Sequence, residues 1–305
     1  MTDLPDLFPG FATHRIKTAD AELHVRIGGR GPPLVLLHGY PQTHVIWHRV
    51  APELAKHATL IIPDLRGYGQ SSVPAAEADH RSYSKRAMAG DIKHMMRQLG
   101  FPRYMVAGHD RGARVAYRLA LDAPDQVQRL IVLDILPTID AWDGLRWGSA
   151  IKAYHWQFLA QPAPLPETLI AANPAYYVDH TLASWTMAKN LECFDPRALM
   201  HYRAALQRPE RITAVCEDYR AGATFDRLAD EADRQAGNKI ACPTLLLWGS
   251  DYIGKGTADP LDVWRRWCVV LKGQEIRSGH FLVEENPADT LAAMIPFIAP
   301  EDDGA

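Results

Sequence analysis

The sequence has few cysteines, no long apolar run and no clustered metal-ligand motif. Its four cysteines lie more than twenty residues apart, which excludes the close pairs of common zinc and redox motifs. No apolar run approaches the roughly 18 residues of a membrane helix, and the opening MTDLPDLFPG does not read as a secretion signal. We therefore expect free thiols, no metal, no membrane association and a cytoplasmic location.

The sequence also lacks an excess of charge of either sign. Lysine and arginine number 33 against 36 aspartates and glutamates, a formal net charge of −3, so the basic surplus needed to neutralise a nucleic acid is missing. We expect no nucleic-acid partner. With 47% hydrophobic and 23% charged residues in 305, the chain has the composition of a folded protein with a sizeable core.

Short apolar runs followed by helical patterns recur along the chain. Amphipathic stretches such as Lys85–Leu99 and Arg114–Asp122 separate them. This alternation predicts an α/β fold with a doubly wound, mostly parallel sheet. The predicted strands are the run LVLLHG from Leu34, Thr59–Ile62, Tyr104–Ala107, Leu130–Leu133 and Thr244–Trp248.

The alternation stops in one long segment. Residues 139–222 contain no buried-strand run and predict several short helices interrupted by prolines. They hold four of the eight tryptophans, as expected for an inserted helical cap that packs on the core and faces a cleft. We therefore predict a core in two parts, 1–138 and 223–305, with a cap at 139–222.

The most specific local motif is GHDRGARV at 108–115. It has the glycine-x-nucleophile-x-glycine frame between a strand and a helix, and the central residue is Asp110. An aspartate is already anionic at neutral pH, so it needs no base to attack. Attack on an acyl carbonyl would give a reactive anhydride, whereas displacement at a saturated carbon gives an ester that water can hydrolyse. The motif therefore favours the second reaction.

Other residues stand where partners of this nucleophile are expected. The sequence HGYP at 38–41 follows the first strong strand, so the backbone N–H groups of Tyr40 and Arg111 are candidate oxyanion donors. His280, in SGHF near the C-terminus, is the candidate general base. Asp134 and Asp251 each follow a strand and compete to orient it; we favour Asp134, which emerges directly from its strand.

Taken together, these motifs resemble the α/β-hydrolase superfamily, in the branch of dehalogenases and epoxide hydrolases with an aspartate nucleophile. The resemblance covers most of the chain and rests on LLHGYPQ at 36–42, DLRGYGQSS at 64–72, GHDRGA at 108–113, LLLWG at 245–249 and GHFLVEENP at 279–287. In that branch the later acid usually stands three residues after the Trp-Gly pair. Tyr252 occupies that place here, which strengthens Asp134.

A second departure points to a substrate. Many relatives carry tryptophan after the nucleophile, whereas this chain has Arg111, with Arg114 one helical turn later. Paired guanidinium groups suit a carboxylate, and the sequence is most similar to fluoroacetate dehalogenases, whose elbow reads D-R-G-x-R. The resemblance assigns Arg111 and Arg114 to the substrate carboxylate. It assigns the departing halide to His155, Trp156 and Tyr219.

The resemblance therefore implies a haloacetate dehalogenase that acts on a small haloacid and forms a homodimer. It needs no metal or organic cofactor. Two other functions stay open from the sequence. An epoxide hydrolase would share Asp110, His280 and Asp134 and would use cap tyrosines such as Tyr154 and Tyr219. A ligand sensor would retain the fold without the reaction.

Overall fold

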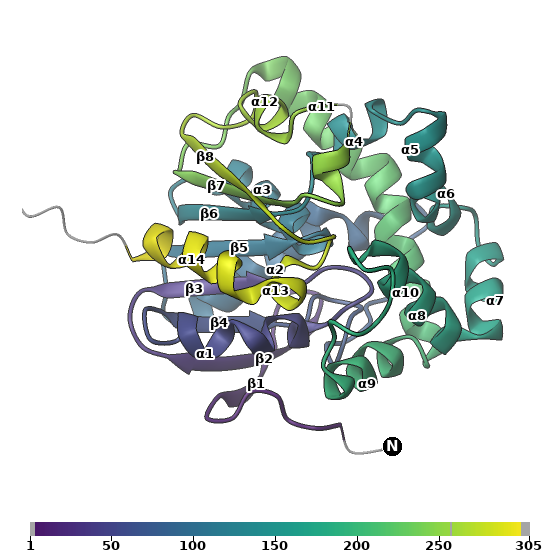
Figure 1. Ribbon diagram of the computed structural model, residues 1–305, viewed down its shortest axis with the longest axis horizontal. Helices are drawn as coiled ribbons and strands as arrows, with labels where there is room; N and C mark the ends of the chain where they lie inside the picture. The colour runs from purple at the N-terminus through teal and green to yellow at the C-terminus, as the bar shows by residue number, and fades with distance from the viewer. Residues whose placement is uncertain (1–3, 257, 300–305) are drawn as a thin grey trace, which may run out of the picture.

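The computed structural model describes residues 4–256 and 258–299 and contains an eight-stranded sheet (Figure 1). The strand order is β1-β2-β4-β3-β5-β6-β7-β8. β1 and β2 pair antiparallel, β2 pairs antiparallel with β4, and the remaining neighbours are parallel. The strands are β1 Ala12–Lys17, β2 Glu22–Gly29, β3 Pro33–Leu37, β4 Thr59–Pro63, β5 Tyr104–His109, β6 Val127–Leu133, β7 Thr244–Gly249 and β8 Leu271–Ile276.

The five strands predicted from apolar runs are β3 to β7. Strands covered by helices on both faces carry continuous apolar side chains, and every residue of β5 and β7 is buried. The sequence did not predict β1, β2 or β8. β1 and β8 lie at the two edges of the sheet, and their polar residues are mostly exposed or half-buried, so neither has the apolar run of an inner strand.

Helices cover the sheet and continue beyond it. The predicted helix Lys85–Leu99 is α2, and the predicted Arg114–Asp122 lies within α3. The α-helices are α1 Ala51–Leu54, α2 Lys85–Gln98, α3 Arg111–Asp122, α4 Thr138–Asp143, α5 Trp147–Lys152, α6 Tyr154–Leu159, α7 Leu165–Ala172, α8 Pro174–Trp185, α9 Pro196–Ala205, α10 Pro209–Ala221, α11 Arg227–Ala236, α12 Pro260–Trp264, α13 Leu282–Glu285 and α14 Pro287–Ile298.

The chain between β6 and β7 is helical throughout its regular structure. It runs from α4 to α11 without a strand, and a π-helical turn at Gly222–Asp226 joins α10 to α11. Figure 1 shows α5 to α10 gathered beyond one end of the sheet, at the right of the view. Proline stands in the first turn of α7, α8, α9 and α10, where its missing N–H leaves no helical hydrogen bond unmade.

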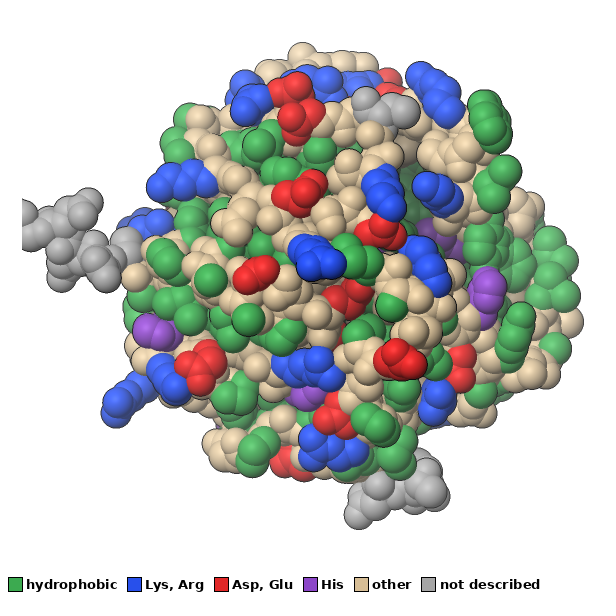
Figure 2. Space-filling model, viewed as in Figure 1, with side chains coloured by type: hydrophobic (Ala, Val, Ile, Leu, Met, Phe, Trp, Pro, Cys, Tyr) green, Lys and Arg blue, Asp and Glu red, His purple; other side chains and the backbone are tan. Residues whose placement is uncertain are grey.

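The surface carries charges of both signs. Figure 2 shows lysine and arginine side chains interspersed with aspartate and glutamate over the visible face, with apolar side chains at the edge where Figure 1 places α5, α6 and α7. No basic stripe crosses this face, in keeping with the balanced composition. Among the described residues, none of the helices has both the length and the apolar character needed to span a membrane.

Candidate active site

Asp110 stands at the turn where β5 ends and α3 begins. Its φ of 47° lies in the left-handed region that side chains other than glycine rarely adopt. The turn needs small neighbours: a Cβ on Gly39 would lie 2.5 Å from the Cβ of Asp110, and one on Gly112 would lie 2.3 Å from the carbonyl oxygen of His38. The side chain of Asp110 makes no capping hydrogen bond to α3, so it is free for another task.

A backbone N–H group holds one oxygen of the Asp110 carboxylate. The N–H of Tyr40 donates to Oδ2 of Asp110 at 3.0 Å. The N–H of Arg111 opens α3 beside Asp110, at the positive end of the helix dipole. Because Oδ2 is held by Tyr40, Oδ1 is the oxygen left to react, and it faces the imidazole of His280 across 3.9 Å from Nε2.

His280 is held in place by Asp134. Nδ1 of His280 lies 2.5 Å from Oδ2 of Asp134, whose Oδ1 accepts the N–H of Gly249 at 2.9 Å. Burial raises the pKa of Asp134, and the hydrogen bond from the N–H of Gly249 opposes that rise. With the proton of this contact on Nδ1 of His280, the lone pair of Nε2 is directed to Asp110. Asp251, the other candidate acid, instead pairs with Lys255 and with Lys189 at 3.3 Å.

The surroundings determine the protonation states of His280 and Asp110. Burial lowers the pKa of His280 to about 4, so the imidazole is neutral at pH 7. Burial alone would raise the pKa of Asp110, but nearby His280, His109 and Arg111 hold it below its usual value. The site therefore holds an ionised aspartate next to a neutral imidazole, which is the state required of a nucleophile with a separate base.

Two buried arginines stand beside Asp110. Arg111 is 1% exposed, and its Nη1 has no hydrogen-bond partner within the described part of the chain. Arg114 donates from Nη1 to the carbonyl oxygen of Leu136 and to Oγ1 of Thr138, each at 3.1 Å, while its Nε lacks a partner there. A buried donor without a partner is costly, so these groups mark a place for a ligand that accepts hydrogen bonds.

Two of the three residues assigned to the halide contact the same arginines, and the third, His155, contacts one of those two. The Arg111 guanidinium lies 4.2 Å from the ring centroid of Tyr219, and that of Arg114 lies 4.5 Å from the ring of Trp156. The rings of His155 and Tyr219 are 5.8 Å apart. Nδ1 of His155 and the hydroxyl of Tyr219 are both buried without a partner among the described residues, so the two groups of predicted residues share one site.

The protonation of these rings suits the binding of an anion. Burial raises the pKa of Tyr219 well above its ordinary value, so the phenol keeps its proton and can donate it in a hydrogen bond. Burial lowers the pKa of His155 to about 3, so its imidazole is neutral and still carries one N–H.

The family model for the alpha/beta hydrolase fold matches residues 32–287. The chain belongs to this family. It is thus a hydrolase by membership, and Asp110 occupies the elbow between β5 and α3 where these enzymes carry their nucleophile.

This hydrolase is similar to proteins of two named activities. It is 40% identical over 298 residues to a fluoroacetate dehalogenase from Burkholderia sp, covering 98% of this chain and 97% of that one. It is 30% identical to a soluble epoxide hydrolase from Corynebacterium sp. (strain C12), covering 94% and 97%. A Pseudomonas aeruginosa mutant provisionally described as an epoxide hydrolase, solved with bound MFA, matches at a TM-score of 0.90 and 44% identity over 97% and 98% of the chains.

Two residues next to His280 of this hydrolase were not predicted from the sequence. The carbonyl oxygen of Trp185 accepts the N–H of His280 at 2.9 Å, and its indole lies between the rings of His155 and His280, at 4.4 and 5.4 Å. Nε2 of His109 lies 2.8 Å from the carbonyl oxygen of His280. His109 stands inside the elbow motif, whereas no motif marks Trp185 within the cap.

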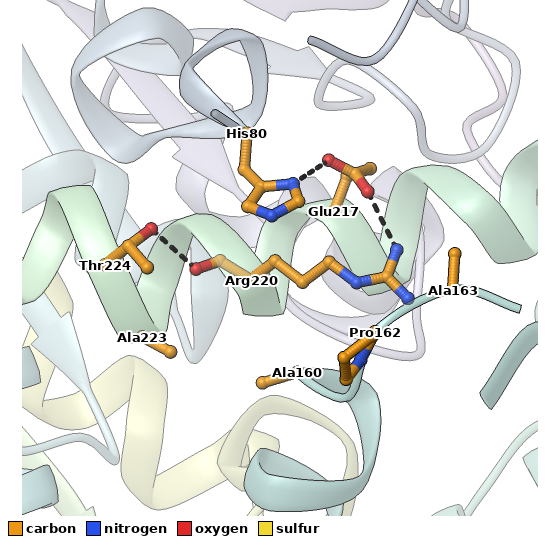
Figure 3. Close-up of a pocket in the computed structure, with 8 residues that line it drawn as sticks. All are labelled: His80, Ala160, Pro162, Ala163, Glu217, Arg220, Ala223 and Thr224. Atoms are coloured by element: carbon orange, nitrogen blue, oxygen red, sulfur yellow. Dashed lines mark hydrogen bonds and ion pairs between the residues drawn. The ribbon is translucent and has the colours of Figure 1, made fainter. Parts of the chain in front are cut away.

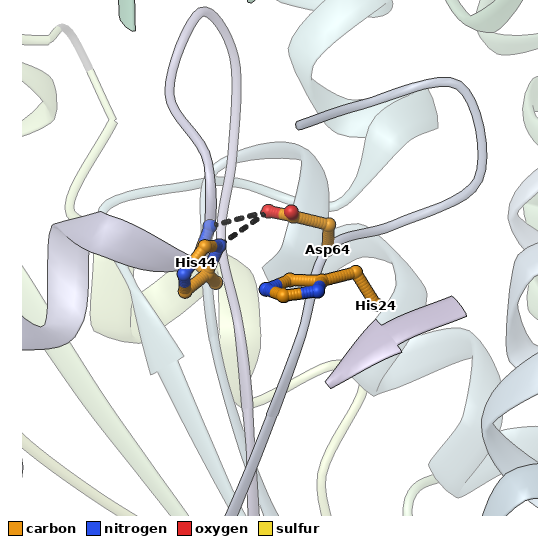
Figure 4. A group of neighbouring side chains, drawn as sticks. All are labelled: His24, His44 and Asp64. Carbon is orange, nitrogen blue, oxygen red and sulfur yellow. Dashed lines mark hydrogen bonds and ion pairs between the residues drawn. The ribbon is translucent and has the colours of Figure 1, made fainter. Parts of the chain in front are cut away.

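Two other features of the hydrolase lie outside this site. A cavity of ≈ 260 Å³ is lined by residues that include His80, Glu217 and Arg220, and the Glu217 carboxylate already contacts both His80 and Arg220 (Figure 3). His24, His44 and Asp64 place possible metal-ligand atoms within 4.8 Å of one another (Figure 4). Oδ1 of Asp64 already accepts hydrogen bonds from both the backbone N–H and the ring of His44, so a structural contact accounts for this pair.

Proposed function

We propose that this chain is a haloacetate dehalogenase that converts fluoroacetate and water into glycolate, fluoride and a proton. The observation that carries the proposal is the pair of buried guanidinium groups, with unpartnered N–H groups, beside the ionised Asp110. A carboxylate held by Arg111 and Arg114 would place its α-carbon in front of the nucleophile. The identity to a fluoroacetate dehalogenase supports the same substrate class.

The first step is displacement at carbon. Oδ1 of Asp110 forms a bond to the α-carbon, and the carbon–halogen bond breaks with its electron pair leaving on the halide. His155, Trp156 and Tyr219 donate hydrogen bonds to the departing ion, which matters most for fluoride because it is the poorest leaving group of the halides. The product of this step is an ester of Asp110 in which Oδ1 carries a carboxymethyl group, CH2COO−.

The second step is hydrolysis of that ester. Nε2 of His280 takes a proton from water, and the oxygen adds to the carboxyl carbon of Asp110. The negative charge develops on Oδ2, which already accepts the N–H of Tyr40, with the Arg111 N–H as second donor. Collapse of this intermediate breaks the bond between the carboxyl carbon and Oδ1, which leaves as the hydroxyl oxygen of glycolate with the proton from His280. The oxygen from water stays in the Asp110 carboxyl group, which releases a proton to become a carboxylate again.

Halide release distinguishes the candidate functions. The purified chain is expected to release fluoride from fluoroacetate in many-fold excess over enzyme, measured with an ion electrode, and to form no diol from styrene oxide. Acetamide-type substrates such as fluoroacetamide serve as neutral controls and are expected to react far more slowly, because they do not satisfy two guanidinium groups. Diol formation without fluoride would establish the epoxide hydrolase instead, and absence of both reactions would favour a ligand sensor.

An epoxide hydrolase is the second candidate because of the Corynebacterium relative. It would use tyrosines of the cap as acids. Tyr219 lies in the site, but Tyr154 is 39% exposed and its nearest ring contact is His155, at 6.2 Å. A neutral epoxide would also leave the donors of Arg111 and Arg114 without a charged partner, so this function fits the site less well.

The pH dependence of turnover is expected to reflect the lowered pKa of His280. A base loses activity when it gains a proton, so a pKa of about 4 keeps Nε2 active well below the pH at which an ordinary histidine is protonated. The ester also removes the negative charge of Asp110, which is one of the influences raising the pKa of His280. We expect kcat for chloroacetate to stay nearly constant from about pH 7 to about pH 5.

The control for this measurement is recovery of full activity after each sample returns to pH 7, which separates titration from unfolding. Loss of half of kcat near pH 6.5, the ordinary pKa of histidine, would contradict the expected pKa shift.

The homodimer, the cytoplasmic location and the cap boundaries stay predictions.

A further inference from the structure

One acidic residue of α10 holds the guanidinium group of Arg111. Nε of Arg111 donates to Oδ2 of Asp218 at 3.2 Å, and Nη2 donates to Oδ1 at 2.6 Å and to the carbonyl oxygen of the same residue at 2.8 Å. This side-on arrangement uses the Nε and Nη2 edge of the group and leaves Nη1 as the edge without a partner among the described residues. Asp218 therefore determines which donors of Arg111 are available to a ligand.

Asp218 itself is shared with a second cation. The buried Lys85, from the first turn of α2, forms an ion pair with Asp218 and lies 3.6 Å from Asp226. The hydroxyl of Tyr68 donates to Oδ2 of Asp218 at 2.7 Å. Burial opposes ionisation, but Arg111 and Lys85 together hold the pKa of Asp218 below its usual value, so the carboxylate stays charged.

Packing holds the Arg111 guanidinium on one face and at Nη2, and leaves the Nη1 edge for a ligand. Tyr219, the residue after Asp218, places its ring 4.2 Å from the guanidinium carbon. One helical turn beyond Asp218, a Cβ on Gly222 would lie 2.9 Å from Nη2, so only glycine leaves room for the guanidinium against this helix. Neighbouring residues of α10 and the turn after it thus fix both the plane and the edge of Arg111.

We propose that Asp218 is a positioning residue that directs Nη1 of Arg111 at the substrate carboxylate, and that Lys85 preserves the positive charge of Arg111 by sharing Asp218. The inference rests on the proposed function. It adds an explanation of how the site selects a substrate that carries a carboxylate. If Asp218 served Arg111 alone, the pair would be close to neutral and would attract an anion weakly. With Lys85 on the other side, Asp218 is shared between two cations. Asp226 also lies 3.6 Å from Lys85, but burial raises its pKa and so opposes its negative charge, and the Arg111 edge remains attractive to a small monocarboxylate.

Asp218→Asn tests the positioning. The amide loses the charge and one of the two side-chain acceptors, so Arg111 gains freedom, and KM for chloroacetate is expected to rise by about 10- to 100-fold with a smaller change in kcat. Asp179→Asn is the matched control, because Asp179 also holds an arginine side-on, at 2.7 and 3.0 Å to Arg203, but this pair is half-buried and does not involve Arg111. Its KM is expected to equal that of the wild type.

Lys85→Met tests the charge sharing and stands in if Asp218→Asn does not fold. It keeps the apolar stem and removes the charge, so KM for chloroacetate is expected to rise several-fold, while the low reactivity toward fluoroacetamide stays the same. Thermal stabilisation by acetate, compared with acetamide, measures carboxylate binding without turnover, and both variants are expected to lose the acetate effect.

The outcomes separate this inference from the proposed function. Wild type that releases no halide but is stabilised by acetate, with stabilisation lost in the variants, would overturn the function and support the positioning role. Wild type that releases fluoride while a folded Asp218→Asn or Lys85→Met variant keeps its KM and its acetate effect would overturn the inference alone. A parallel loss in Asp179→Asn would also overturn it, because the effect would then not depend on the contact with Arg111.

Discussion

Replacing Asp110 with asparagine is expected to abolish halide release, with a fall in turnover of about 10⁴-fold or more. A neutral amide oxygen is a far weaker nucleophile than a carboxylate. The other carboxylate of the site, Asp134, is not available, because both of its oxygens are bound, one to His280 and one to the N–H of Gly249. Fluoride release from fluoroacetate, followed over hours at high enzyme concentration, measures the residual rate.

This substitution also leaves the fold nearly intact, which makes the result interpretable. Asparagine has the shape of aspartate and tolerates positive φ, and the side chain of Asp110 does not cap α3. The melting temperature of the variant should therefore be close to that of the wild type. Retention of more than about one per cent of wild-type turnover in a variant confirmed by mass spectrometry would remove Asp110 from the role of nucleophile.

Replacing His280 with asparagine is expected to stop the reaction half-way. Oδ1 of Asp110 can still attack, since the first step needs no base, but no group remains to take the proton from water. General bases contribute about 10²- to 10⁴-fold, so the ester should accumulate on the protein and steady-state turnover should fall by that factor. Intact-mass measurement after mixing with chloroacetate is expected to show one added carboxymethyl group, and peptide mapping should place it on Asp110.

The matched control is the double variant Asp110→Asn with His280→Asn, which lacks the acceptor of the group and is expected to show no added mass. A burst of halide equal to the enzyme concentration should accompany the adduct in the single variant. Unmodified protein after incubation, together with full turnover, would contradict the two-step scheme.

The inner strands and the elbow were predictable because their signals are local. A strand buried on both faces needs an apolar run, and a nucleophile turn needs its glycines, so β5 and Asp110 are visible within a few neighbouring residues. The edge strands β1 and β8 are held by hydrogen bonds to a neighbour, and their polar side chains face outward. Nothing in their composition separates such strands from loops.

The partners of Asp110 show where a single sequence becomes insufficient. His280 and Asp134 are 146 residues apart, and both Asp134 and Asp251 follow a strand, so only the spatial arrangement shows which acid meets the imidazole. Asp218 and Trp185 lie within α10 and α8 and belong to no motif. Their importance comes from packing against the core, where Asp218 contacts a residue 107 positions away.

Both Asp110 and Asp134 adopt positive φ, at 47° and 56°. A residue with a side chain held in this conformation costs of order 1–3 kcal/mol, a large share of the small margin by which a domain is stable. Glycine would relieve the strain at either position and would remove the chemistry. At these two positions, therefore, a substitution by glycine that makes the fold more stable also abolishes the reaction.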